Sequence, residues 1–551
     1  MIIKRISLFV LCLGFLAGCA RQMPPRDWHR EYGEIPASAA PLEMAPGFHT
    51  LEYGGFDFGT PRAIPAMDEN VRTISVLLPL SGTNAALGMG IQHSIEIAFL
   101  QKQPTNIIVL FNDISGTQSE RLERMRAALN RNPDLIIGPI FSEDVAMLKN
   151  LKDIATPALT FTSDTNVLGD GVFTFALMPV QSVEAIVQNT AATGASRMMI
   201  LAPDTRAGHM LANAALDSAR IHGVSVAGLY YYKENDMTSQ KAVAERAAMF
   251  RPRQQALTRA REILSDALTT QNLTEEEHEN MDAQLTRLNR ADTIGNPPYD
   301  AVLLLGSPGD SKSLASFLRY FDVPAASVRF LGTAVWDTSS MWRDLTMSGA
   351  EYSALPAISP EFVRIYSALH GREPNRMNSM GYDAAMLAIG ALSGGRPPAA
   401  HLLDPSGYRG LDGLVRLRPN GTNERALQIM RLNGSGAPRI RTQPARNFLT
   451  PLYQIGSPRA SRLREIEPSD GFNALDYISM PAHLYWQYRS QTFRLSGASE
   501  EALDAARFTP IETVIPEDDS DAVIEIDPYF QPIPLDTIDR QLVESVTVVE
   551  R

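Results

Sequence analysis

Cysteine is almost absent from this chain of 551 residues: the two that occur, Cys12 and Cys19, both lie near the N-terminus. A disulfide framework is therefore excluded for everything downstream. Basic residues are also in deficit, since 50 Lys and Arg face 62 Asp and Glu and give a formal net charge of -12. A general nucleic-acid-binding protein needs a basic face, so no nucleic acid is expected as a partner.

Catalytic and metal-binding motifs are missing as well. The nine histidines form no His-x-His or His-Glu-x-x-His spacing, so the sequence indicates no metal site. Ser81, Ser142 and Ser163 lack the Gly-x-Ser-x-Gly elbow of a serine hydrolase. Asp113 could serve as an acid or base, but an Asp at a strand end more often caps the next helix. We therefore expect neither an enzyme nor a bound cofactor.

One uninterrupted apolar run stands out at the N-terminus. It covers residues 6–15 behind Lys4 and Arg5, is too short to span a membrane, and has the form of a secretory signal peptide. It ends in Leu-Ala-Gly-Cys19, which resembles the bacterial lipobox, where the cysteine thiol takes a diacylglycerol. The alternative is an ordinary signal peptide with an incidental cysteine. We expect residues 1–18 to be a lipoprotein signal peptide and Cys19 to be lipidated.

What remains is globular in composition, with 44% hydrophobic and 20% charged residues. Residues 19–70 contain seven prolines without sustained periodicity and are interpreted as a Pro-rich tether. Residues 446–551 form a C-terminal extension in which the pattern weakens. From residue 512 onward, eleven acidic residues face only Arg540 and Arg551, and four prolines are interspersed, so we expect a disordered acidic tail.

Between these ends the pattern is that of an α/β protein. Short runs rich in Val, Ile and Leu at residues 71–82, 107–111 and 134–139 alternate with helical periodicity at 88–100 and 119–130. This alternation predicts βαβ units and a parallel sheet. A second set of such units follows from Arg197, which predicts two similar lobes. A strandless stretch at about 240–289 is interpreted as a helical insert that can be removed without unfolding the lobes.

Several segments carry a family resemblance, among them Leu77-Leu78-Pro79-Leu80-Ser81-Gly82, Ile136-Ile137-Gly138-Pro139, Pro157-Ala158-Leu159-Thr160-Phe161 and Gly381-Tyr382-Asp383. They resemble the type I periplasmic-binding fold of the leucine/isoleucine/valine-binding receptors, and more closely the penicillin-binding-protein activators, which are outer-membrane lipoproteins. The resemblance covers roughly residues 71–432 within an expected domain of 71–445. It implies two Rossmann-like lobes around a cleft. It also implies outer-membrane sorting on the periplasmic face, because Ala20 rather than Asp follows Cys19.

The resemblance also implies where a ligand would bind. In the amino-acid receptors, hydroxyls and amides of two loops hold the ligand carboxylate. The candidate cleft residues at matching positions, with the strand-end Ser81, are Ser81, Ser142, Thr162, Ser163, Asp164 and Ala207. Asp164 stands where the receptors have Thr, and a second carboxylate beside a carboxylate ligand is repulsive. Ala207 replaces an aromatic residue that packs on the ligand, so the amino-acid site is eroded.

Two functions of different class remain open. The first is an outer-membrane lipoprotein that binds and activates a peptidoglycan synthase, a penicillin-binding protein. The second is a substrate-binding receptor for an amino acid or another small molecule, serving an ABC transporter. Outer-membrane anchoring, the insert and the acidic tail favour the first. The sequence leaves open whether the cleft holds a small-molecule ligand.

Overall fold

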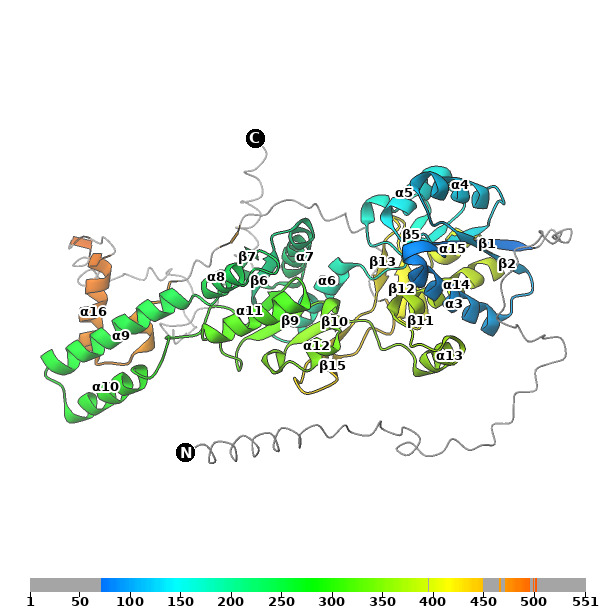
Figure 1. Ribbon diagram of the computed structural model, residues 1–551. Helices are drawn as coiled ribbons and strands as arrows, with labels where there is room; N and C mark the ends of the chain where they lie inside the picture. Colours follow the sequence, from blue (N-terminus) through cyan, green and yellow to red (C-terminus); the bar gives the residue numbers. More distant parts are fainter. Residues whose placement is uncertain are drawn as a thin grey trace, which may run out of the picture. The chain divides into compact units, whose positions relative to one another are not determined.

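The computed structural model describes residues 71–394, 396–448, 465–466, 471–495, 499 and 501–502 (Figure 1). The expected signal peptide with Cys19, the tether and the acidic tail from residue 512 lie outside these residues. Within them, strands and helices alternate as expected, and the α/β fold class is confirmed.

Lobe 1 is built on a five-stranded, fully parallel sheet in the order β2-β1-β3-β4-β5. Six of the seven residues of the central strand β1 are buried, as expected for a strand covered on both faces. Its strands are β1 (Arg72–Leu78), β2 (Ile107–Asp113), β3 (Leu135–Ile137), β4 (Ala158–Thr160) and β5 (Val172–Thr174), and its first helices are η1 (Gly82–Asn84), α3 (Ala85–Lys102), α4 (Gln118–Leu129), α5 (Ser142–Leu151) and η2 (Thr165–Val167).

Lobe 2 has a seven-stranded sheet in the order β15-β14-β10-β9-β8-β6-β7. β14 runs antiparallel to β10, and β15 runs antiparallel to β14; the other neighbouring strands are parallel. Its strands are β6 (Arg197–Pro203), β7 (Ser225–Tyr232), β8 (Ala301–Leu304), β9 (Arg329–Gly332), β10 (Glu351–Ala354), β14 (Gln428–Arg431) and β15 (Arg439–Thr442), and its helical elements are α6 (Pro179–Ala192), α7 (Arg206–His222), α8 (Met237–Ala247), α11 (Pro308–Tyr320), η3 (Ala334–Trp336), α12 (Ser339–Trp342) and η4 (Leu345–Met347).

The chain returns to lobe 1 between β10 and β14. Ala384, Ala385 and Ala388 of α14 pack with Ile91 and Ile95 of α3 in one apolar core. Residues 410–421 contribute to a three-stranded antiparallel sheet, in which glycines with positive φ at 413 and 421 mark the turns. The returning elements are α13 (Pro360–His370), α14 (Arg376–Ser393), α15 (Pro398–Leu402), β11 (Tyr408–Gly410), β12 (Gly413–Leu417) and β13 (Asn423–Arg425).

The two lobes repeat one local device where their first strand meets its helix. A Cβ atom added at Gly88 would lie 2.0 Å from the carbonyl oxygen of Pro79, and one added at Gly208 would lie 2.0 Å from that of Pro203. Both helices therefore approach the end of their strand closely enough to require glycine. This repeat fits the expectation of two similar lobes.

Three chain crossings join the lobes, after β5, after β10 and before β14, and buried side chains tie them together. Asn423 Nδ2 donates to the carbonyl oxygens of Thr174 at 3.0 Å and Ala176 at 2.7 Å. Gln428 Nε2 donates to the Leu355 carbonyl at 3.1 Å, across the second and third crossings. The crossings are thus held side by side.

A polar cluster beside these crossings contains two fully buried carboxylates, Asp383 and Asp412. Asp412 accepts from Arg376 Nη1 at 2.9 Å and from Ser379 Oγ at 2.9 Å. Arg376 also lies 4.0 Å from Asp337 of lobe 2. Burial and, secondly, the charge of Asp412 raise the pKa of Asp383 to about 7.

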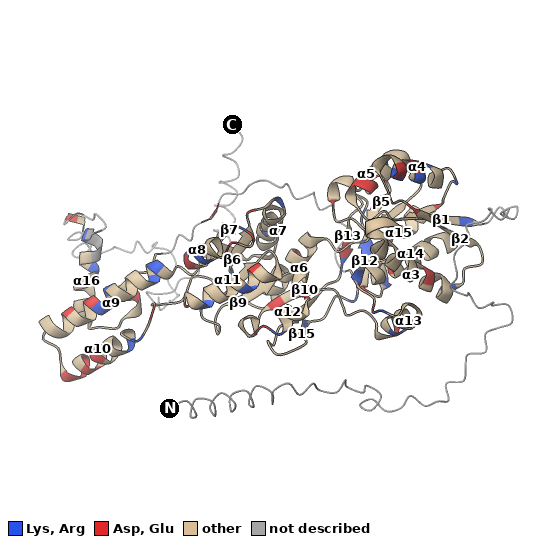
Figure 2. Ribbon diagram, in the orientation of Figure 1, with Lys and Arg blue, Asp and Glu red and all other residues tan. Residues whose placement is uncertain are grey.

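The expected insert divides into two parts. Its first helix, α8, belongs to lobe 2, since Val243, Ala244 and Ala247 lie in the lobe core and Gln240 Nε2 donates to buried Asp310 at 2.6 Å. The boundary at residue 240 is therefore corrected to about 250. The second part is a hairpin of α9 (Phe250–Thr270) and α10 (Glu275–Leu288), with charges of both signs along it (Figure 2).

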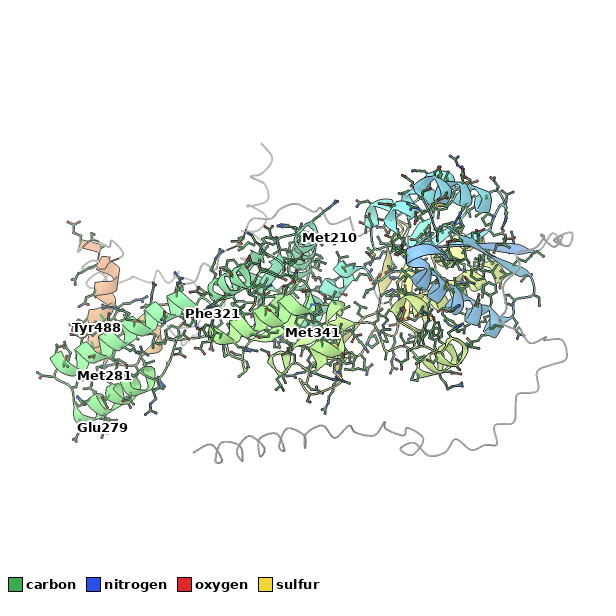
Figure 3. The ribbon with its side chains drawn as sticks, viewed as in Figure 1. Met210, Glu279, Met281, Phe321, Met341 and Tyr488 are labelled. Carbon is green, nitrogen blue, oxygen red and sulfur yellow. The ribbon has the colours of Figure 1, made fainter. Side chains whose placement is uncertain are left out.

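Part of the C-terminal extension folds onto this hairpin, which the weak sequence pattern did not indicate. Side chains of η5 (Ala474–Tyr477) and α16 (Ala482–Leu495) complete an apolar core with α9 and α10. We call α9, α10, η5 and α16 together the helical arm. Figure 3 labels Met281 and Tyr488 in the arm and Phe321 in lobe 2. Buried Arg253 of α9 joins arm to lobe by donating to the carbonyls of Gly295 at 2.8 Å and Asp322 at 3.1 Å.

Candidate functional site

The carboxyl ends of the parallel strands of lobe 1 form the candidate site. Ligands of open α/β sheets bind in the crevice outside these ends. The sheet order places the loop after β1 between the loops after β2 and β3, with the loop after β4 next in line. Ser81, Ser115, Phe141 and Ser163 therefore stand along one edge of the sheet.

Asp113, at the end of β2, organises the first two loops. Its carboxylate accepts from Ser81 Oγ at 2.6 Å, from Ser115 Oγ at 2.5 Å and from the Leu80 N–H at 2.9 Å. Burial opposes ionisation, but these hydrogen bonds outweigh it and lower the pKa of Asp113 to about 2. Asp113 is therefore an ionised acceptor that fixes two serine hydroxyls. The expectation that it caps the next helix is wrong, because Thr117 caps α4.

A cavity of about 280 Å³ lies against these loops. Its two formal charges pair with each other, since Arg121 Nε lies 2.8 Å from Asp144 Oδ1. Burial raises the pKa of Asp144, although Arg121 opposes the rise. The rest of the wall offers hydroxyl, amide and aromatic groups. Lining residues include Ser81, Asn84, Ser115, Arg121, Phe141 and Asp144.

Of the six residues expected in the cleft, Ser81 lines this cavity and the other five lie elsewhere. Ser142 is the half-buried first residue of α5. Thr162 is buried, and its Oγ1 accepts from the Asp164 N–H at 3.1 Å, while Ser163 is exposed. Ala207 is exposed in the first turn of α7 in lobe 2.

Asp164 has a local structural role. Its Oδ1 accepts from the backbone N–H of Asn166 at 3.0 Å and from Asn166 Nδ2 at 2.8 Å, which caps the 3₁₀-helix η2. Both donors are neutral, so these contacts leave the negative charge of the carboxylate in place.

Sequence reasoning missed Ser115, Arg121, Phe141 and Asp144. The signal was positional for Ser115, Phe141 and Asp144, which closely follow the ends of predicted strands, whereas Arg121 lies inside a predicted helix. The sequence could not show that Arg121 on α4 pairs with Asp144 on α5, because contacts between helices depend on the tertiary structure.

The strand ends of lobe 2 are occupied by internal contacts. His209 Nε2 lies 2.9 Å from Asp204 Oδ1, and the His209 ring lies 4.1 Å from that of Tyr231. Burial, with Asp204 and Glu465 adding to it, raises the pKa of Tyr231 to about 12.

Two further properties bear on function. In the described part of the chain, no group of three or more His, Cys, Asp or Glu side chains is arranged to hold a metal ion. Helices long and apolar enough to cross a bilayer are likewise not found among the described residues.

Comparisons with solved structures give matches at low identity. A Rhodospirillum rubrum protein assigned to branched-chain amino acid ABC transport is 15% identical, with a TM-score of 0.51, over 67% of this chain and 99% of that one. A leucine binding protein from Thermotoga maritima is 17% identical, with a TM-score of 0.41, over 67% and 98%. An ABC transporter substrate-binding protein from Sphaerobacter thermophilus is 17% identical, with a TM-score of 0.44, over 68% and 96%.

At these identities the likeness shows the fold alone. Among curated proteins, no match to the sequence was found. The family model described as "Periplasmic binding protein" matches residues 72–437, about two thirds of the chain. This chain therefore belongs to the periplasmic binding protein family.

Proposed function

We propose that this protein is a periplasmic receptor that holds a small polar molecule at the strand ends of lobe 1. The observation that carries the proposal is the cavity beside Ser81 and Ser115, whose hydroxyls are oriented by Asp113. The family is typically one of non-enzymatic ligand-binding proteins, and similar folds serve ABC transport. Delivery to an ABC transporter is the role that this reading implies.

The hydrogen bonds of the wall define the ligand's chemistry. The Ser81 hydroxyl donates its proton to Asp113, so its oxygen has only lone pairs to offer. The Ser115 hydroxyl donates to Asp113 at 2.5 Å or to the Ser81 carbonyl at 2.8 Å, so its oxygen also has only lone pairs to offer a ligand. The ligand must therefore supply O–H or N–H donors. Phe141, 37% exposed, offers an apolar surface beside them.

Leucine and its branched-chain relatives are expected to bind poorly. The binding mode of the amino-acid receptors would hold the ligand carboxylate near Thr162 and Ser163, outside the lobe 1 cavity and close to Asp164. Two like charges about 5 Å apart repel by roughly 3 kcal/mol at an effective dielectric of about 20, which is about a hundredfold in affinity. Leucinol, which replaces the carboxylate by a hydroxyl donor, is the matched ligand without this cost.

Calorimetry on the detergent-solubilised full chain is the test. For ligands held in the mode of the amino-acid receptors, we expect leucinol to bind about a hundredfold tighter than leucine, and Asp164→Thr to reduce this difference in affinity. Micromolar binding of leucine would contradict the expected repulsion. If amino acids, amino alcohols, sugars and short peptides all fail to bind, the receptor proposal is overturned.

A second candidate is an activator of a peptidoglycan synthase, and the helical arm favours it. The arm adds no strand to either sheet and no residue to the lobe 1 cavity. The family model covers residues 72–437, so η5 and α16 of the arm lie beyond it. A pull-down from envelope extract, with stimulation of the recovered synthase, tests this candidate; loss of stimulation without the arm would support it.

We also propose that the protein is anchored in the outer membrane through lipidated Cys19, facing the periplasm. The expected result is that Cys19→Ser releases the protein from the membrane fraction, because several acyl chains hold a protein firmly and a short signal peptide does not. Fractionation with a high-salt wash measures this. A Cys12→Ser variant is the matched control and should remain anchored; a Cys19→Ser protein that still sediments with outer membrane would exclude the anchor.

A further inference from the structure

The strand β15 forms one edge of the seven-stranded sheet. It pairs with β14 on one side, and no strand in the described part of the chain pairs with its other side. All four of its residues, Arg439 to Thr442, are exposed. An open edge presents unpaired N–H and C=O groups that another extended segment can join.

This edge is also strongly basic. Arg439 stands opposite Arg431 in the ladder. Arg441 lies in a register shift of the ladder and reaches Glu351, the residue opposite Arg431 on its other side. The carboxylate of Glu351 meets Arg441 Nε at 3.6 Å and Arg329 Nη1 at 3.9 Å. Within the described residues, no ion pair forms at Arg431 or Arg439. Like charges directly opposite in a sheet are destabilising, so the edge favours an acidic partner.

The opposite edge of the same sheet shows how this chain covers an edge. There Ile466 of the C-terminal extension pairs with Leu229 of β7 through N–H···O bonds of 2.9 and 3.0 Å. The preceding Glu465 meets Arg246 at 2.9 Å. A short acidic-apolar segment from the C-terminal extension therefore already serves as an edge partner.

The tail contains a segment that matches the basic edge. Val523-Ile524-Glu525-Ile526-Asp527 alternates with period two, so as a strand it would place both acids on one face and both isoleucines on the other. β15 carries Arg439 and Arg441 two residues apart with Ile440 between them, although a register shift beside Arg441 interrupts its regular alternation. Pro528 would end the pairing.

A long stretch of tail separates this segment from residue 502, the last described residue. The 21 residues from 502 to 523 span up to about 70 Å when extended. We propose that residues 523–527 add a strand to β15, with Glu525 and Asp527 beside Arg439 and Arg441. The acidic tail then acts as an intramolecular edge cover that shields the sheet from other chains.

Hydrogen exchange on the full chain tests the pairing through the amides of residues 439–442. We expect exchange at the outward-facing amides to be at least about tenfold slower in the full chain than in a chain that ends at residue 510, because a pairing worth about 1.4 kcal/mol or more gives that factor. Arg439→Glu/Arg441→Glu should remove the protection, and so should Glu525→Arg/Asp527→Arg. Combining the four changes should restore it.

Two controls separate the proposal from its competitors. Asp536→Arg/Asp539→Arg makes the same charge change elsewhere in the tail and should leave the protection intact; an equal loss would mean unspecific attraction and overturn the assignment. A disulfide between Ile440→Cys and Ile526→Cys should form within one chain. Cross-linked dimers alone would show that β15 pairs with a second copy, and unchanged exchange on truncation would refute the proposal outright.

Discussion

Replacing Asp412 by alanine is expected to lower the free energy of unfolding by about 3–5 kcal/mol, the range for breaking a buried ion pair. The carboxylate is fully buried and holds both Arg376 and Ser379, so its removal leaves their donors without a partner. Urea unfolding followed by circular dichroism measures the loss.

The loss should depend on pH in a defined direction. The pKa of Asp383 is raised to about 7 in the folded protein, against about 3.9 in the unfolded chain, so the stability it contributes is full below pH 4 and is lost as the pH rises towards 7. At pH 5 Asp383 is uncharged, so there is no charge repulsion between it and Asp412. At pH 8 both are charged, and removing Asp412 relieves a repulsion. Asp412→Ala should therefore cost more at pH 5 than at pH 8.

Asp337 provides the matched control. It lies 4.0 Å from the same arginine, but both side chains are 31% exposed, and such pairs contribute at most about 1 kcal/mol. Asp337→Asn, which removes the charge but keeps an acceptor for the buried Tyr352 hydroxyl 2.9 Å away, should therefore cost far less than Asp412→Ala. Equal losses for the two variants would show that Arg376, rather than the buried carboxylate, dominates the cluster.

Deleting residues 240–289 is expected to unfold lobe 2, in contrast to the expectation drawn from sequence alone. The deletion removes Val243, Ala244, Ala247 and Ala248 from the core, and full burial of these side chains contributes about 4–5 kcal/mol. It also takes Gln240 from the buried Asp310, at a further cost of about 1–3 kcal/mol. The sum is comparable to the whole stability of a typical domain, about 5–15 kcal/mol. A cooperative thermal melt should be lost.

A second deletion separates the arm from the lobe. Replacing residues 256–291 by a Gly-Ser bridge keeps α8 and Arg253, and ending the chain before residue 471 removes the helices that would lose their partner. This double deletion should melt cooperatively. If it unfolds while the 240–289 deletion melts normally, our division between lobe and arm is wrong.

Much of the fold followed from local pattern. The strands from β1 to β4 are short apolar runs that stop at Gly, Pro or polar residues, and their boundaries differ from expectation by a few residues. The two elements that were misassigned, α8 and α16, are amphipathic helices whose roles depend on what they pack against. Helical periodicity shows that a face will be buried, but not which core buries it.

The candidate site was less predictable than the fold. Ser81 was found because it follows a strand end, and that rule depends only on topology. Asp164 was expected to face a ligand, whereas its carboxylate bonds to Asn166, two residues on. Such short-range capping competes with any role in binding, and only coordinates decide between them.

The attachment of the arm to lobe 2 has a mechanical consequence. Arg253 and the core around α8 fix the base of α9 to the lobe, so any rotation of lobe 2 about the three crossings carries the arm with it. A helix of 21 residues is about 32 Å long, so a turn of about 10° moves its far end by about 6 Å. A small displacement of the lobe would then be magnified at the tip of the arm.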